Sequence, residues 1–278
     1  MKKLLITTIM LMTTATTSYA SLKVTPTVLE LNANNARGNY ITTSFDVQGG
    51  EDETIRFKVY PSYFEISNQG KMLELSQESS EHSLIKNARF MPNEFTLSNG
   101  KPQKVRLTVA NLKSLPEGES RMILFLEDVV AKEVLLPNQK KDVVTKLMVK
   151  TRVGIPVYVD KGRFVKCASF DDLMIKKKPD GMELNAKLVS KGNSKVRYTG
   201  KAQIIKDKQL IDEFTLNSSA IRNNGEFYLV QAIPLEKITE VGDYKLRAIL
   251  NYKNEKSDNK QIIKEAEFSV NTIESTKI

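Results

Sequence analysis

The chain has 278 residues, enough for two ordinary domains. Its 42 Lys and Arg exceed its 33 Asp and Glu, and 40% of its residues are hydrophobic, a globular composition. One cysteine and one histidine exclude an intramolecular disulfide and metal sites built from Cys or His clusters. Because lysines are interleaved with acidic residues nearly everywhere, we expect no nucleic-acid partner.

The N-terminal segment has the pattern of a secretory signal peptide. Lys2 and Lys3 precede a short apolar run, and small or hydroxylated residues follow it up to Ala20. The run is too short to cross a bilayer, which takes about 20 residues. The residue directly after the predicted cleavage site is Ser21 and not cysteine, and no later segment is apolar enough to span a membrane. We therefore predict a cleaved signal peptide at 1–20 and an exported, unanchored mature protein, in the periplasm of a cell with two membranes.

The remainder of the chain has the pattern of half-buried β-strands. Apolar and polar residues alternate with a period of two in many short segments. Clear examples lie at 55–59, 105–109, 244–252 and 266–270. Turn-forming Gly, Asn and Pro residues separate these segments, and no long helical periodicity is present. This pattern predicts an all-β protein made of antiparallel immunoglobulin-like sandwiches.

The strongest predicted strand runs from Leu147 to Val159, where every second residue is apolar or Thr. The polar, turn-prone segment 160–163 follows it, and then a fresh series of strands begins. We therefore expect two immunoglobulin-like sandwiches in tandem, at 21–160 and 161–278.

No sequence motif indicates catalysis. The chain lacks a nucleophile elbow, a glycine-rich phosphate loop and a His-Glu-x-x-His helix. His82 lies in a polar, loop-like segment, and we expect Cys167 to be a small buried residue in the first strand of the second sandwich. The acidic pairs at 51–52 and 171–172 are expected in turns and at strand edges, with calcium binding as the alternative. We predict no enzyme activity, no cofactor and no metal.

One stretch is more specific than the rest. It contains the pattern Pro-x-x-Phe-x-Leu-x-x-Gly-x-x-Gln-x-Val-Arg at 92–106, a Leu-Pro turn at 115–116 and Thr-Arg-Val at 151–153. With this spacing the chain resembles the N-terminal domain of the PapD-like periplasmic chaperones of pilus assembly. The segment 24–29 is similar to the first strand of that family. The second half resembles the family's smaller C-terminal sandwich through 191–193 and 241–244.

The resemblance implies a function in fimbrial biogenesis. Such chaperones complete an unfinished pilus subunit by donating the last strand of their first domain. In this chain the donor residues implied are Val143, Leu147 and Val149. The implied partners are exported, β-rich, pilin-like subunits and an outer-membrane usher. Two alternatives stay open: the apolar row packs only its own core, or the chain is a secreted tandem immunoglobulin-like structural or adhesion module without chaperone activity.

The resemblance also implies a site for the subunit's terminal carboxylate. The family holds this group with an Arg in the first strand and a Lys in the last. The corresponding positions here, near Val28 and at Gly154, are not basic. Arg152 lies one pleat from Gly154 on the same strand face, and Lys150 one pleat further. A guanidinium can hold a carboxylate through two hydrogen bonds. Arg152 and Lys150 are therefore the candidate carboxylate anchors.

Overall fold

The computed structural model describes residues 22–50, 54–75, 80–136, 145–179 and 181–271. The predicted signal peptide and Val143 lie outside these ranges. Within them the regular secondary structure is almost entirely β-strand, as the alternation predicted. The helical segments among them are two short 3₁₀ turns, η1 (Ala33–Asn35) and η2 (Leu112–Ser114). No described helix is long and apolar enough to cross a membrane.

The first sandwich is built from two facing sheets. One has the strand order β1-β3-β8-β6, and the other has the order β2-β12-β9-β4-β5 with β7 also paired to β4. The strands are β1 (Leu22–Thr25), β2 (Leu29–Asn32), β3 (Tyr40–Gly49), β4 (Ile55–Ile66), β5 (Met72–Leu75), β6 (Ala88–Met91), β7 (Glu94–Leu97), β8 (Gln103–Ala110), β9 (Gly118–Asp128) and β12 (Arg152–Lys161). The N-terminal chain changes sheets, because β1 pairs with β3 and β2 then runs parallel to β12.

Alternation explains the core of this sandwich. Side chains at every second position of a strand face the opposite sheet. Phe45 and Val47 from one sheet pack with Val157 and Val159 from the other in a single buried cluster. The fully buried aliphatic and aromatic side chains supply the apolar area that holds the two sheets together.

The second sandwich follows the same plan. One sheet has the order β13-β14-β17 and the other β16-β15-β18-β19. The strands are β13 (Ser169–Lys178), β14 (Gly181–Ser190), β15 (Val196–Lys206), β16 (Gln209–Ile221), β17 (Gly225–Ala232), β18 (Gly242–Lys253) and β19 (Asn259–Val270). A separate buried cluster, which includes Leu184, Leu188, Ile204 and Leu246, fills the space between them. The prediction of an all-β chain with two sandwiches is confirmed.

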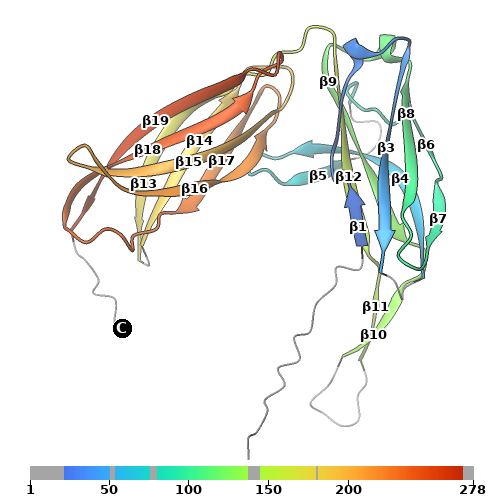
Figure 1. Cartoon of the computed structure of the whole chain (residues 1–278), viewed down its shortest axis with the longest axis horizontal. Helices are drawn as coiled ribbons and strands as arrows, with labels where there is room; N and C mark the ends of the chain where they lie inside the picture. Colours follow the sequence, from blue (N-terminus) through green and yellow to red (C-terminus); the bar gives the residue numbers. More distant parts are fainter. Residues whose placement is uncertain (1–21, 51–53, 76–79, 137–144, 180, 272–278) are drawn as a thin grey trace, which may run out of the picture.

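The two sandwiches meet at an angle, and two hairpins of the first extend beyond it (Figure 1). The β4–β5 hairpin reaches toward the second sandwich. The other hairpin, β10 (Lys132–Leu136) with β11 (Thr145–Val149), is a separate two-stranded sheet that projects from the end of the first sandwich far from the link to the second.

The prediction of one continuous strand from Leu147 to Val159 is wrong in one respect, because the strand is interrupted at residues 150–151. At this joint the N–H of Asp128 donates to the Thr151 carbonyl oxygen (3.0 Å), and the N–H of Thr151 donates to Asp128 Oδ2 (3.2 Å). A side-chain acceptor thus replaces a ladder partner, which separates the β9–β12 pair from the β10–β11 hairpin.

Cys167 also differs from its expectation. It lies in the connection before β13 rather than in a strand, and it is half-buried. The connection carries the chain from one sandwich to the other, and neither core covers it completely.

Candidate functional site

A single row of side chains runs along β11 and β12 and changes from exposed to buried. Leu147 and Val149 are 47% and 40% exposed, whereas Ile155, Val157 and Val159 are at most 1% exposed. All five have the same parity in the sequence. We call this set the apolar row. Its inner half belongs to the core of the first sandwich, and its outer half extends beyond that core on the hairpin.

Strand β12 has an unpaired edge along part of its length. On one side β12 pairs with β9 from Arg152 to Lys161, but on the other side it pairs with β2 only from Val157 to Asp160. The segment 152–156 therefore has no strand on its outer side within the described residues. Pro156 lies in this segment, and a proline, which has no N–H to donate to a ladder, is typical of an edge strand.

The two faces of β11 differ in chemistry. Leu147 and Val149 alternate with Lys146, Met148 and, just after the strand, Lys150. Lys146 Nζ lies 3.0 Å from Glu133 of β10, so this face carries an ion pair across the hairpin. Met148, which is 60% exposed, lies between the two lysines in the sequence pattern of that face. On β11 the apolar side chains Leu147 and Val149 therefore share one face, and the other face carries lysines together with Met148.

Arg152, a candidate carboxylate anchor, lies at the first residue of β12, on the sheet face opposite the apolar row. Its guanidinium stacks over the ring of Phe125, 3.4 Å from the ring centroid, and Nη2 donates to Glu74 of β5. The Arg152 side chain is 37% exposed. Partial burial raises the pKa of Glu74, but hydrogen bonds from Arg152 and Ser62 outweigh it, so the pKa lies below its ordinary value. Arg152 thus already holds a carboxylate of its own chain.

The other anchor positions are placed differently. Lys150 Nζ is 3.8 Å from Glu127, and its side chain is half-exposed. At Gly154 a Cβ atom would lie 2.5 Å from Ile123 Cδ1 and 3.0 Å from a ring carbon of Phe125. A lysine therefore cannot be added at Gly154 unless these side chains move. The structure brings Arg152 close to that position but places no cation at it.

Sequence reasoning missed a buried charged cluster between the two sandwiches. Glu119 and Arg121 of β9 and Lys195 of the second sandwich are 0%, 2% and 3% exposed. Lys195 Nζ lies 3.4 Å from Glu119 and 3.1 Å from Glu30, and Arg121 Nη1 lies 3.0 Å from Glu65. Burial raises the pKa of Glu30, but Lys195 and then Arg197 outweigh it and lower the pKa to about 2.

A signal for this cluster was present in the sequence. Glu119 and Arg121 share a strand face with Ile123 and Phe125, so charged and apolar residues follow one another on one side of β9. The partner Lys195 is distant in the sequence, and nothing local identifies it.

The tip of the β4–β5 hairpin forms a second contact between the sandwiches. The N–H of Tyr228 on β17 donates to the Asn68 carbonyl oxygen (2.7 Å). Gly70 has a φ of +76°, and a Cβ atom there would lie 2.8 Å from the ring of Phe227. Glycine is therefore required both by the turn and by the close approach of the two sandwiches.

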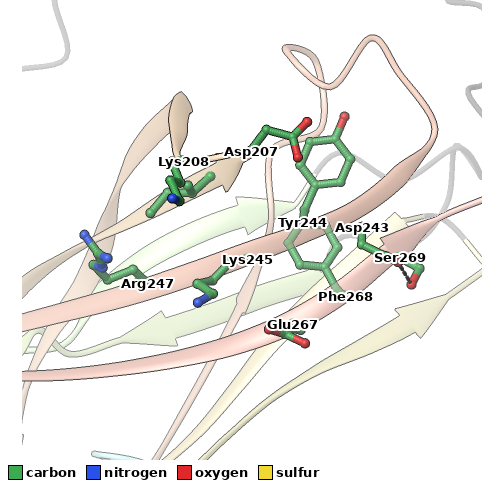
Figure 2. A pocket seen from close by; sticks show the side chains of 10 residues that line it. Asp207, Lys208, Asp243, Tyr244, Lys245, Arg247, Glu267, Phe268 and Ser269 are labelled. Atoms are coloured by element: carbon green, nitrogen blue, oxygen red, sulfur yellow. Dashed lines mark hydrogen bonds between the residues drawn. The ribbon is translucent and has the colours of Figure 1, made fainter.

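A surface hollow lies in the second sandwich, where β18 and β19 meet the β15–β16 turn (Figure 2). Its walls carry both signs of charge, with Lys208, Lys245 and Arg247 near Asp207 and Glu267. Lys245 and Arg247 are each already paired with Glu265. No group of three metal-ligating side chains is present among the described residues.

Comparisons with known proteins give matches at the level of structure. No protein-family model and no curated protein sequence matches the chain. The solved structure of the class 5 fimbriae chaperone CfaA is similar over 87% of this chain and 98% of its own, with 13% identity and a TM-score of 0.43. The E. coli chaperone DraB is similar over 91% and 98%, with 9% identity and a TM-score of 0.42.

A third match is a Salmonella enterica structure of the SafA pilin in complex with the SafB chaperone. It covers 90% of this chain and 96% of its own, with 11% identity and a TM-score of 0.42. These are the kind of proteins that the sequence was predicted to resemble, and that prediction is confirmed.

Proposed function

We propose that this chain is a periplasmic chaperone that binds exported, pilus-type subunits by donating a strand from its first sandwich. The observation that supports the proposal is the apolar row, which continues out of the core to the exposed Leu147 and Val149. The row spans β11 and β12, and β12 has an unpaired edge at 152–156. Unpaired backbone groups beside exposed apolar side chains are what strand addition requires.

The free energy available from burying the exposed part of the apolar row is large enough to contribute to binding a subunit. Full burial of a Val or Leu side chain contributes about 1.5–3 kcal/mol. Leu147 and Val149 keep 47% and 40% of their exposure, so a partner that covers them gains about half of that range from each. The inner half of the row is held by the core, which fixes β12 before a partner arrives and reduces the entropy lost when a partner binds along that strand.

In this proposal Val143 continues the apolar row beyond the described residues, and Arg152 contacts an acidic group of the bound subunit, with Lys150 one pleat further out. The partner completes its own sandwich with the donated strand. An outer-membrane usher, which would receive the complex, is part of the proposal.

The proposal is tested by capturing partners with the tagged mature chain in the periplasm of its own cells and identifying them by mass spectrometry. We expect a small exported β-rich subunit to be captured by the wild type and lost with Leu147→Asp. The matched control is Met148→Asp, because it adds the same charge to the opposite face of the same strand. Circular dichroism and thermal unfolding of both variants establish that the fold is retained.

Backbone pairing gives a second readout. In the isolated complex, hydrogen exchange is expected to slow for those N–H groups of residues 152–155 that point away from β9, because ladder hydrogen bonds protect amides from solvent. Capture that Leu147→Asp and Met148→Asp weaken equally would contradict strand donation. A chain that captures no subunit in its own periplasm would favour the secreted structural module.

A further inference from the structure

The guanidinium of Arg152 has the features of a carboxylate-binding group, and it lies on the sheet face over β9, inward from the unpaired edge of β12. Arg152 is the first residue of β12 and of the segment 152–156, which has no strand on its outer side within the described residues. The ring of Phe125 lies 3.4 Å below it, and that of Tyr60 lies 5.8 Å away. Stacking on aromatic rings orients the guanidinium plane and leaves its N–H groups directed sideways.

The carboxylate it holds comes from a distant part of the chain. Glu74 belongs to β5, a four-residue edge strand whose three apolar side chains, Met72, Leu73 and Leu75, are all at least 40% exposed. The Arg152 and Glu74 side chains are themselves 37% and 45% exposed. Because water reaches both partners, such an ion pair contributes little to stability and is readily exchanged.

We infer that Glu74 competes for Arg152 with an acidic group of the bound protein, so that binding transfers the guanidinium from β5 to a carboxylate of the partner. The inference rests on the proposed function, because it takes a partner segment to lie along the edge that begins at Arg152. It adds a regulatory element to that site: β5 neutralises the cation while the edge is empty. The chemical class recognised is a carboxylate, either a chain terminus or an Asp or Glu side chain.

The competition itself is tested with acetate as the probe. The Arg152 Nε–H signal of the full mature chain is followed by NMR during an acetate titration, for the wild type and for Glu74→Gln. We expect Glu74→Gln to respond at an acetate concentration about two- to fivefold lower, the factor that corresponds to an exposed ion pair. Glu213→Gln is the control, because it removes a carboxylate from a comparably exposed pair with Lys201 in the second sandwich. Equal response of the wild type and Glu74→Gln would overturn the inference.

The source of the carboxylate is separated with two strand-length peptides of alternating Val and Thr. One ends in a free carboxylate, and the other is amidated and carries one Glu. If Arg152 recognises a terminal carboxylate, Glu74→Gln strengthens binding of the first peptide alone. If it recognises a side-chain carboxylate, Glu74→Gln strengthens binding of the second peptide alone. Arg152→Ala is expected to abolish either gain. A gain for a third peptide, amidated and without Glu, would overturn the inference, because competition between carboxylates cannot produce it.

The test of the competition between Glu74 and a partner carboxylate gives its result independently of the test of strand donation. Failure of strand donation appears as subunit capture that is insensitive to Leu147→Asp. Failure of the competition appears in the acetate titration, which requires no subunit.

Discussion

The two ends of the β9–β12 strand pair differ in which side chains are buried: charged side chains are buried at one end, and apolar side chains are exposed beyond the other. At the end near the second sandwich, Glu119 and Arg121 are buried and matched by charges of both sandwiches. At the other end, Leu147 and Val149 are exposed on a hairpin that projects away from the molecule. The first end is an interface completed within the chain. The second end has the composition of an interface whose partner is another molecule.

The largest effect is expected at the completed end. Arg121→Ala leaves the carboxylate of Glu119 buried with only Lys195 nearby among the described residues, and removing one partner of a buried pair costs about 3–5 kcal/mol. Urea unfolding measures this loss. Arg197→Ala is the control, because its pair with Glu30 is about half-exposed and contributes about 1 kcal/mol or less. Similar losses in the two variants would contradict the distinction between buried and exposed pairs.

The second prediction compares the two halves of the apolar row. Ile155→Ala is expected to destabilise the first sandwich by about 2–5 kcal/mol, because it leaves a cavity in a packed core. Leu147→Ala is expected to change stability by less than about 0.5 kcal/mol, because its side chain has no core around it. Thermal unfolding of both variants measures the difference. A large loss in Leu147→Ala would show that the outer half also serves the fold.

A smaller effect is expected at the hairpin contact between the sandwiches. Gly70→Ala forces a left-handed φ on alanine and brings its Cβ atom against Phe227, so we expect a loss of about 1 kcal/mol or more. Faster hydrogen exchange of the Tyr228 amide would report loosening of the contact itself. In Gly38→Ala the new Cβ atom meets only ordinary contacts with Tyr40, so no change is expected in that control.

The smallest effect depends on pH and concerns Glu30, whose side chain is 45% exposed, so that solvent screens its ion pairs and keeps their contribution to stability small. The pKa of Glu30 is lowered to about 2 from its ordinary value of 4.5, so the folded state favours the charged form. Its contribution is therefore complete above pH 4.5 and is lost as the pH falls toward 2. The melting temperatures of the wild type and Glu30→Gln should differ at about pH 6 and converge near about pH 2. A constant difference across this range would contradict the ion pairs with Lys195 and Arg197.

The sequence alone was sufficient for the fold class and for the apolar row. Period-two alternation depends on neighbouring residues, so it can be recognised without knowing what packs against each strand. The same reasoning placed Arg152 on the strand face of Gly154. It failed at the joint of residues 150–151, because the Asp128 carboxylate that interrupts the strand lies more than twenty residues earlier.

The tertiary structure decided which residues of a uniform alternating pattern are buried and which side chains they contact. Leu147 and Val157 have the same parity and similar chemistry, yet only Val157 has the opposite sheet across from it. The pairing of Arg152 with Glu74 and of Glu119 with Lys195 joins residues 78 and 76 positions apart. Alternation fixes the direction of a side chain, but burial and ion pairing depend on which distant segments the folded chain brings beside it.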